Sequence, residues 1–149
     1  MVHLECKLEP LPVAFEAIER AADAALAHET VTGDLTVVLT DNAQVRKLNR
    51  DYLGIDSPTD VLAFPASEKD PETGSTYLGD VVISVPVASA QAQAAGHPLA
   101  AEVQLLVVHG VLHLLGHDHA NAEAKSRMWE AQAEVLKRIG LADVVMSET

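Results

Sequence analysis

The order of hydrophobic and polar residues predicts a chain that mixes strands and helices. Four segments have the alternation or the short apolar run of a β-strand: residues 2–8, 35–40, 61–64 and 79–85. Five segments have helical periodicity: residues 12–28, 41–52, 87–95, 99–115 and 121–139. No internal repeat, low-complexity tract or linker interrupts this order, so we expect a single domain over residues 1–149.

Individual residues sharpen several of these predictions. Pro12 suits the first turn of the first helix, and Asp41 suits the N-cap of the second. The helix over residues 99–115 is apolar on nearly all sides, which predicts that it is buried against the sheet. The last helix is amphipathic, and we interpret its Met128 and Trp129 as core or interface residues.

Composition and length are those of an ordinary globular domain. The 149 residues are 48% hydrophobic and include one cysteine, Cys6, which we expect to pack in the core. The first residues do not have the pattern of a signal peptide, and no stretch of about 18 apolar residues predicts a membrane span. We therefore expect a cytoplasmic protein without a membrane partner.

The formal net charge of −12 is unusual for a protein that binds nucleic acid, because such binding depends on lysine and arginine. A local basic patch would have to compensate for this charge. The best candidate is Arg46, Lys47 and Arg50, on the predicted second helix. A solvated helix face without a binding role explains these three residues equally well.

The chemistry of the chain is concentrated in the run HGVLHLLGHDH, residues 109–119, which contains four of the seven histidines. His109 and His113 are four residues apart, so on a helix both imidazoles face one side and can reach one metal ion. On a continuing helix His119 would lie about 9 Å beyond His113, too far to share that ion. We therefore predict that the helix ends at Gly116, where a left-handed conformation is easily adopted.

Alternatives to this ligand set remain. His117 continues the stripe of His109 and His113, but on an unbroken helix it would lie about 12 Å from His109. The histidines could also be hydrogen-bonded residues at a helix end, where imidazolium suits the helix dipole. Asp118 could orient a histidine, assist a bound water or cap the turn. The polar stretch SEKDPETGST, residues 67–76, is predicted as a mobile loop over or beside the site.

The spacing of His109, His113 and His119 around Gly116 matches the zinc-binding run of metzincin proteases in every feature but one. The glutamate that serves those proteases as general base is here Gly110. The metal-ligand part of the pattern is therefore present and the proteolytic part is absent. Imidazole sites also accept nickel, copper and iron, so spacing alone leaves the metal open.

Three sequence blocks together resemble the YbeY family of bacterial endoribonucleases and ribosomal-RNA maturation factors. They are PTDVLAFP at residues 58–65, LGDVVIS at residues 78–84, and the histidine run. The resemblance extends over essentially the whole chain. It implies an α/β domain with helices around a small mixed sheet, and one Zn²⁺ per chain held by residues that correspond to His109, His113 and His119. It further implies a cytoplasmic enzyme with two roles, maturation of the 16S ribosomal-RNA 3′ end and ribosome quality control.

The implied partners are therefore precursor RNA of the small ribosomal subunit and the ribosome or its proteins, and no DNA is expected. One residue departs from the family pattern. Members often have an arginine in a Tyr-Arg-Gly context before the PTDVL block, whereas this chain has Leu53 between Tyr52 and Gly54. Such an arginine suits phosphate binding and stabilisation of transition-state charge. Arg50, about one helical turn earlier, is a candidate substitute.

The mechanism that we predict is attack of a zinc-bound water on a phosphodiester of single-stranded RNA. Three neutral imidazoles leave the ion an open position, where the pKa of water falls to about 7. Asp60, Asp80 and Asp118 are candidates for proton transfer or support, and each has an alternative role as a turn, strand-end or cap residue. Thr59 and Ser84 are candidates for contact with the substrate backbone. Structural hydrogen bonding is the simpler role for both.

Two other function classes fit parts of the pattern. A metallohydrolase of another substrate fits the metzincin-like spacing, although Gly110 disfavours it. A ribosome-assembly factor with a purely structural zinc ion fits Leu53 and the acidic net charge. Removal of the metal distinguishes a structural ion, whose loss unfolds the domain, from a catalytic one.

Overall fold

The computed structural model describes residues 1–56, 59–118 and 120–144. Over these residues the chain forms four strands, which are β1 (Val2–Cys6), β2 (Asp34–Thr40), β3 (Val61–Lys69) and β4 (Thr76–Ser84). It also forms five helices, which are α1 (Phe15–His28), α2 (Asn42–Leu53), α3 (Val85–Ala95), α4 (Leu99–Leu114) and α5 (Ala122–Arg138). All nine elements that the hydrophobic pattern predicts are therefore present in the predicted order.

The four strands form one mixed sheet in the order β1-β2-β4-β3. β1 pairs with β2 and β2 with β4 in parallel, whereas β3 pairs with β4 in the antiparallel direction. The parallel connections require crossovers, which α1 makes between β1 and β2. The α/β fold with a small mixed sheet, which the family resemblance implied, is confirmed.

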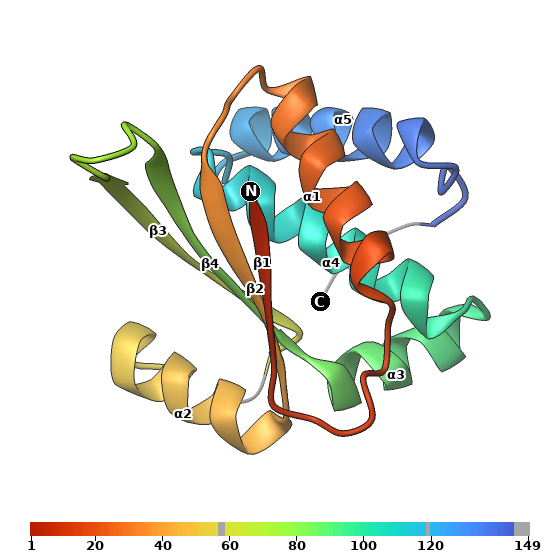
Figure 1. Ribbon diagram of the computed structural model, residues 1–149. Coiled ribbons are helices and arrows are strands. Elements are labelled where there is room, and N and C mark those ends of the chain that lie inside the picture. Colours follow the sequence, from red (N-terminus) through yellow and green to blue (C-terminus); the bar gives the residue numbers. More distant parts are fainter. Residues whose placement is uncertain (57–58, 119, 145–149) are drawn as a thin grey trace.

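Helices cover the two faces of the sheet unequally (Figure 1). α1 and α4 pack on one face, α5 packs outside them against both, and α2 lies on the opposite face. The alternation along β2 explains this arrangement, because Leu35, Val37 and Leu39 are fully buried in the larger core under α1 and α4. Val38 points to the other face, where it packs against a small cluster that includes Val45 of α2.

α4 is the central helix of the domain, as its apolar sequence predicts. Thirteen of its sixteen residues are buried, and its two last turns carry His109 and His113. No single helix in the described ranges is long and apolar enough to cross a membrane. Only α3 and α4 taken together pass that test, with a bend of 116° between them.

The structure corrects the prediction of a loop over residues 67–76. β3 extends to Lys69 and β4 begins at Thr76, so only residues 70–75 connect the two strands. Within this turn the Asp70 amide donates to the Ser75 carbonyl at 2.8 Å. A hairpin ladder is made by backbone groups, so polar side chains such as Glu68 and Lys69 can occupy it when they face solvent. A hydrophobic pattern cannot detect such a strand.

Helix boundaries differ from the predictions by a few residues at two places. α1 begins at Phe15, three residues after Pro12. α3 begins at Val85, directly after β4, because the Ser84 hydroxyl accepts a hydrogen bond from the Val87 amide and caps the helix. The predicted cap of α2 is confirmed, since the Asp41 carboxylate accepts from the Gln44 amide at 2.9 Å.

Candidate metal centre

His109 and His113 lie side by side at the C-terminal end of α4. Their ring centroids are 4.7 Å apart and the rings meet edge to face at 71°. His109 is buried and His113 is half-buried. The prediction that the two histidines share one face of a helix is therefore confirmed, and their spacing suits binding to one ion.

Gln132 of α5 holds the His109 ring in place. The His109 Nδ1 atom lies 2.9 Å from the Gln132 Oε1 atom, and both side chains are buried. With the amide oxygen as acceptor, Nδ1 carries the proton and Nε2 carries the lone pair that a metal needs. Such a hydrogen bond to the second ring nitrogen is typical of metal-binding histidines, so it supports a metal role for His109.

The sequence motifs did not indicate Gln132. The buried residues of α5 are apolar except for Gln132. A polar residue on the apolar face of an amphipathic helix is the signal that could have identified it. A polar side chain at such a position needs a hydrogen-bond partner, and His109 is that partner.

The chain turns where Gly116 was predicted to end the helix. α4 ends at Leu114, and Gly116 has a φ of 102°, in the region that favours glycine. The His117 amide then donates to the Leu112 carbonyl at 3.0 Å, which closes the helix end. The predicted bend of the chain at Gly116, after His113, is therefore confirmed.

The third predicted ligand, His119, lies outside the described residues. Among residues 1–56, 59–118 and 120–144, no group of three His, Cys, Asp or Glu side chains is placed so that it could hold a metal ion. His109 and His113 have the donor chemistry of a metal site, and Gln132 contacts the second ring nitrogen of His109. The full ligand set stays a prediction.

Gly110 occupies the place where α4 comes closest to the sheet. A Cβ atom at this position would lie 2.5 Å from Cγ1 of Val81, a buried residue of β4. A real Cβ cannot approach so closely, and the short branched valine cannot move aside. The position of the protease glutamate therefore faces the packed core in this chain, which argues against a metzincin-like peptidase.

His117 is engaged away from the other two histidines. Its Nε2 atom contacts Oε1 of Glu29, which follows α1, and Oε2 of Glu29 contacts Nδ1 of His28 at 2.9 Å. Partial burial raises the pKa of Glu29, but the hydrogen bonds from His117 and His28 outweigh it, so that the pKa falls below its ordinary value. These contacts tie the segment after α4 to the end of α1.

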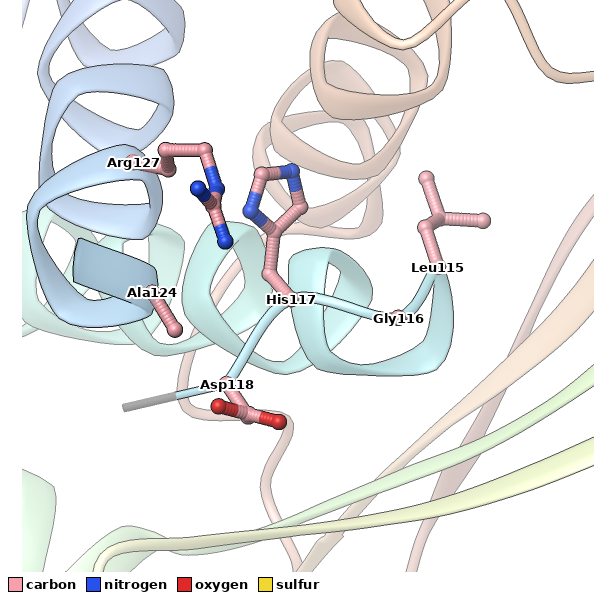
Figure 2. Close-up of a pocket in the computed structure, with 6 residues that line it drawn as sticks. All are labelled: Leu115, Gly116, His117, Asp118, Ala124 and Arg127. Atoms are coloured by element: carbon pink, nitrogen blue, oxygen red, sulfur yellow. The ribbon is translucent and has the colours of Figure 1, made fainter. Parts of the chain in front are cut away.

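A pocket of about 260 Å³ lies beside this segment and is lined by residues 115–118, Ala124 and Arg127. Figure 2 shows the His117 ring and the Arg127 guanidinium on one side of the chain and the Asp118 carboxylate on the other. Asp118 is exposed and accepts a hydrogen bond from the Ala120 amide at 2.9 Å. Of the three roles predicted for Asp118, this contact favours the turn cap.

Asp60 and Thr59 lie at the other end of the sheet. The Asp60 carboxylate accepts from the Val61 amide at 2.8 Å and from Gln91 of α3, while the Asp60 carbonyl accepts from the Ser84 amide. β4 meets the end of α4 at Gly79, which lies close to Leu114. Ser84 is five residues further along the strand, so it lies about 16 Å from Gly79 at 3.3 Å per residue. The structure does not bring Asp60 and Thr59 together with His109 and His113.

Asp80 lies on the face of the sheet opposite α4. Its Oδ1 atom accepts a hydrogen bond from the Tyr77 hydroxyl, which also contacts Thr36 at 2.7 Å. Burial, and then the contact with Asp80, raise the pKa of Tyr77 above its ordinary value. Asp80 is therefore positioned to bind Tyr77 and not to support the histidines.

The three basic residues lie on α2, as predicted, and all are exposed. Arg46 makes a two-point contact with Asp56, from Nε to Oδ1 at 2.8 Å and from Nη2 to Oδ2 at 3.3 Å, and this lowers the pKa of Asp56. Arg50 contacts Asp51 at 3.3 Å. The sheet lies between α2 and α4 (Figure 1), so this basic patch is separate from His109 and His113.

Comparison with known proteins identifies the family of this chain. Residues 9–140 match the family model described as endoribonuclease YbeY. The endoribonuclease YbeY of Moorella thermoacetica is 45% identical over 133 residues, which cover 83% of this chain and 85% of that protein. The relative of the same name from Carboxydothermus hydrogenoformans is 42% identical and covers 95% of this chain and 96% of its own length.

A solved structure has the same fold. The solution structure of TM1509 from Thermotoga maritima is 21% identical, with a TM-score of 0.58, and covers 100% of this chain and 99% of its own. With a matching family model over most of the chain and relatives above 40% identity, this protein belongs to the endoribonuclease YbeY family.

Proposed function

We propose that this protein is a metal-dependent endoribonuclease that cleaves single-stranded precursor RNA of the small ribosomal subunit. Its place of action would be the cytoplasm, in 16S 3′-end maturation and ribosome quality control, with the ribosome or its proteins as partners. The single observation that carries the proposal is the paired His109 and His113, supported by Gln132, in a chain that matches an endoribonuclease family over residues 9–140.

The proposed ligands of one Zn²⁺ ion are His109, His113 and His119. When bound, zinc supplies an activated water nucleophile and a positive charge for a phosphate oxygen. The protein contributes the orientation of the ligands, because Gln132 fixes the His109 ring and the turn at Gly116 redirects the chain. Asp118 stays a candidate for proton transfer, whereas the Asp60 carboxylate is engaged with Val61 and Gln91 at the other end of the sheet and is not proposed for that role. Arg46, Lys47, Arg50 and Thr59 stay candidates for substrate contacts.

A second candidate function is that of a ribosome-assembly factor whose zinc is only structural. Leu53 in the place of a family arginine favours it, since Leu53 is 56% exposed and offers no charge to RNA. Peptide hydrolysis is disfavoured by the packing of Gly110 against Val81.

Metal analysis combined with RNA cleavage tests the proposal. We expect one zinc ion per chain and cleavage of a single-stranded RNA, both lost in His113→Ala. The control is His3→Ala, because His3 is an exposed residue of β1, and this variant should keep both properties. Circular dichroism after chelation then separates the two candidates. Cleavage lost with the fold intact supports a catalytic ion, whereas bound zinc without cleavage by the wild type supports the assembly factor.

A further inference from the structure

Trp129, the one tryptophan of the chain, lies against the candidate metal centre. It is half-buried on α5, and its ring is 5.7 Å from the His109 ring, edge to face at 69°. Trp129 is three residues before Gln132, so the two side chains lie on neighbouring turns of one helix face. The proposed active site therefore has a large aromatic surface beside one of its metal ligands.

A positively charged side chain lies over the Trp129 ring. The Lys125 ammonium lies 5.7 Å from the centroid of the Trp129 ring, one helical turn earlier. Around them is an open hollow of about 470 Å³ that is mainly apolar and is lined by Ala122, Lys125, Ser126, Trp129, Glu130 and Ala133. Small side chains at three of these positions leave the indole ring accessible from solvent.

We propose that Trp129 and Lys125 form a nucleotide-binding subsite, in which an unpaired RNA base stacks on the indole ring and Lys125 contacts the adjacent phosphate. The inference rests on the proposed function and names how that site would hold its substrate. Stacking on aromatic side chains combined with a nearby cation is the usual way in which proteins bind single strands. The flexible stem of Lys125 allows its ammonium to move between the ring and a phosphate.

The charge of the chain favours this mode of binding over a purely electrostatic one. With a net charge of −12, the long-range electrostatic interaction with RNA is repulsive, so contacts with bases have to supply much of the affinity. A base inside a duplex is already stacked and cannot reach the indole ring. The subsite therefore also accounts for selection of single strands.

The fluorescence of Trp129 provides a direct test, because it is the single tryptophan. A ten-nucleotide oligouridylate added to the metal-loaded protein should quench the emission in a saturable way, read immediately after mixing. A duplex of the same length should not quench it. If the wild type cleaves the single strand but its emission does not change, the subsite is wrong while the proposed function stands. If it neither binds nor cleaves RNA, the proposed function fails.

Variants distinguish stacking from packing. Trp129→Leu keeps an apolar side chain and should raise the KM for the oligouridylate on the order of tenfold, whereas Trp129→Phe should restore most of the affinity. Lys125→Gln should lower the dependence of binding on salt by about one phosphate contact. The comparison variant is Tyr52→Leu, since Tyr52 is 70% exposed on α2 across the sheet, and its KM should rise much less than that of Trp129→Leu.

Two results would overturn the subsite. The first is a Trp129→Leu protein with native circular dichroism, full metal content and an unchanged KM. The second is failure of Trp129→Phe to restore affinity although it is folded and holds metal, because an aromatic ring would then be insufficient and the indole would act through packing alone. An effect of Tyr52→Leu in place of Trp129→Leu would place the stacked base on the opposite face of the sheet.

Discussion

Replacement of Gly110 by alanine tests whether α4 packs closely on β4 between His109 and His113. Two effects oppose each other. Alanine is a better helix residue than glycine by about 1 kcal/mol. The added Cβ, however, would lie 2.5 Å from Cγ1 and 3.1 Å from Cγ2 of Val81, and overpacking of this kind costs about 1–3 kcal/mol.

The free-energy cost of the contact with Val81 should lie at the upper end of that range. Val81 is fully buried, and its branched side chain has no flexible end that could move away. We therefore expect Gly110→Ala to lower the free energy of unfolding by about 2 kcal/mol in net terms. In a domain of this size that corresponds to a fall in Tm of about 4–8 °C.

Urea unfolding followed by circular dichroism measures this change. Ala133→Gly measures the difference in helix propensity between alanine and glycine, because Ala133 is solvent-exposed and lies away from both ends of α5. This variant should lower the free energy of unfolding by about 1 kcal/mol. In a Val81→Ala background the added methyl has room, so Gly110→Ala should become neutral or stabilising. A Gly110→Ala protein that is as stable as the wild type, or more stable, would refute the packing argument.

Three further outcomes are expected. Gln132→Leu should weaken zinc binding about 10- to 100-fold in competition with a chromophoric chelator, because the His109 ring loses its orienting acceptor, whereas Gln132→Glu should bind nearly as well as the wild type. The folded-state pKa of Glu29 is lowered, so its contribution to stability is present above pH 4.5 and is lost as the pH falls through the lowered value. The difference in free energy of unfolding between wild type and Glu29→Gln should therefore become smaller below pH 4.5. A difference that does not change with pH would contradict the lowered pKa of Glu29. Leu53→Arg should raise kcat/KM for RNA with a change in stability within about 0.5 kcal/mol, since Leu53 is exposed, and an unchanged kcat/KM would argue against a phosphate contact there.

Local patterns predicted most of the fold. The alternation along β2, the cap at Asp41 and the bend at Gly116 after α4 depend on residues close together in the sequence, so the sequence alone indicates them. The same holds for His109 and His113, because a spacing of four residues places both on one face of any helix. The extension of β3 to Lys69 was not predictable in this way, since polar strand residues are held by backbone pairing with another segment.

The surroundings of the histidines depend on residues far apart in the chain. Gln132 reaches His109 across 23 residues, and Glu29 reaches His117 across 88. Nothing near Asp60 or Asp80 in the sequence shows that the first lies at the far end of the sheet and the second on its opposite face. Such contacts depend on how helices pack on the sheet.

The elements, their order, the paired imidazoles and the bend that follows them can be inferred from the amino-acid sequence, because the conformational preferences of a few neighbouring residues set these features. The packed domain is needed to show that Gly110 faces Val81, that Gln132 orients His109, and that Trp129 lies beside the same ring. Side-chain contacts between elements depend on steric fit and burial between segments that are far apart in the chain, and no local spacing encodes them.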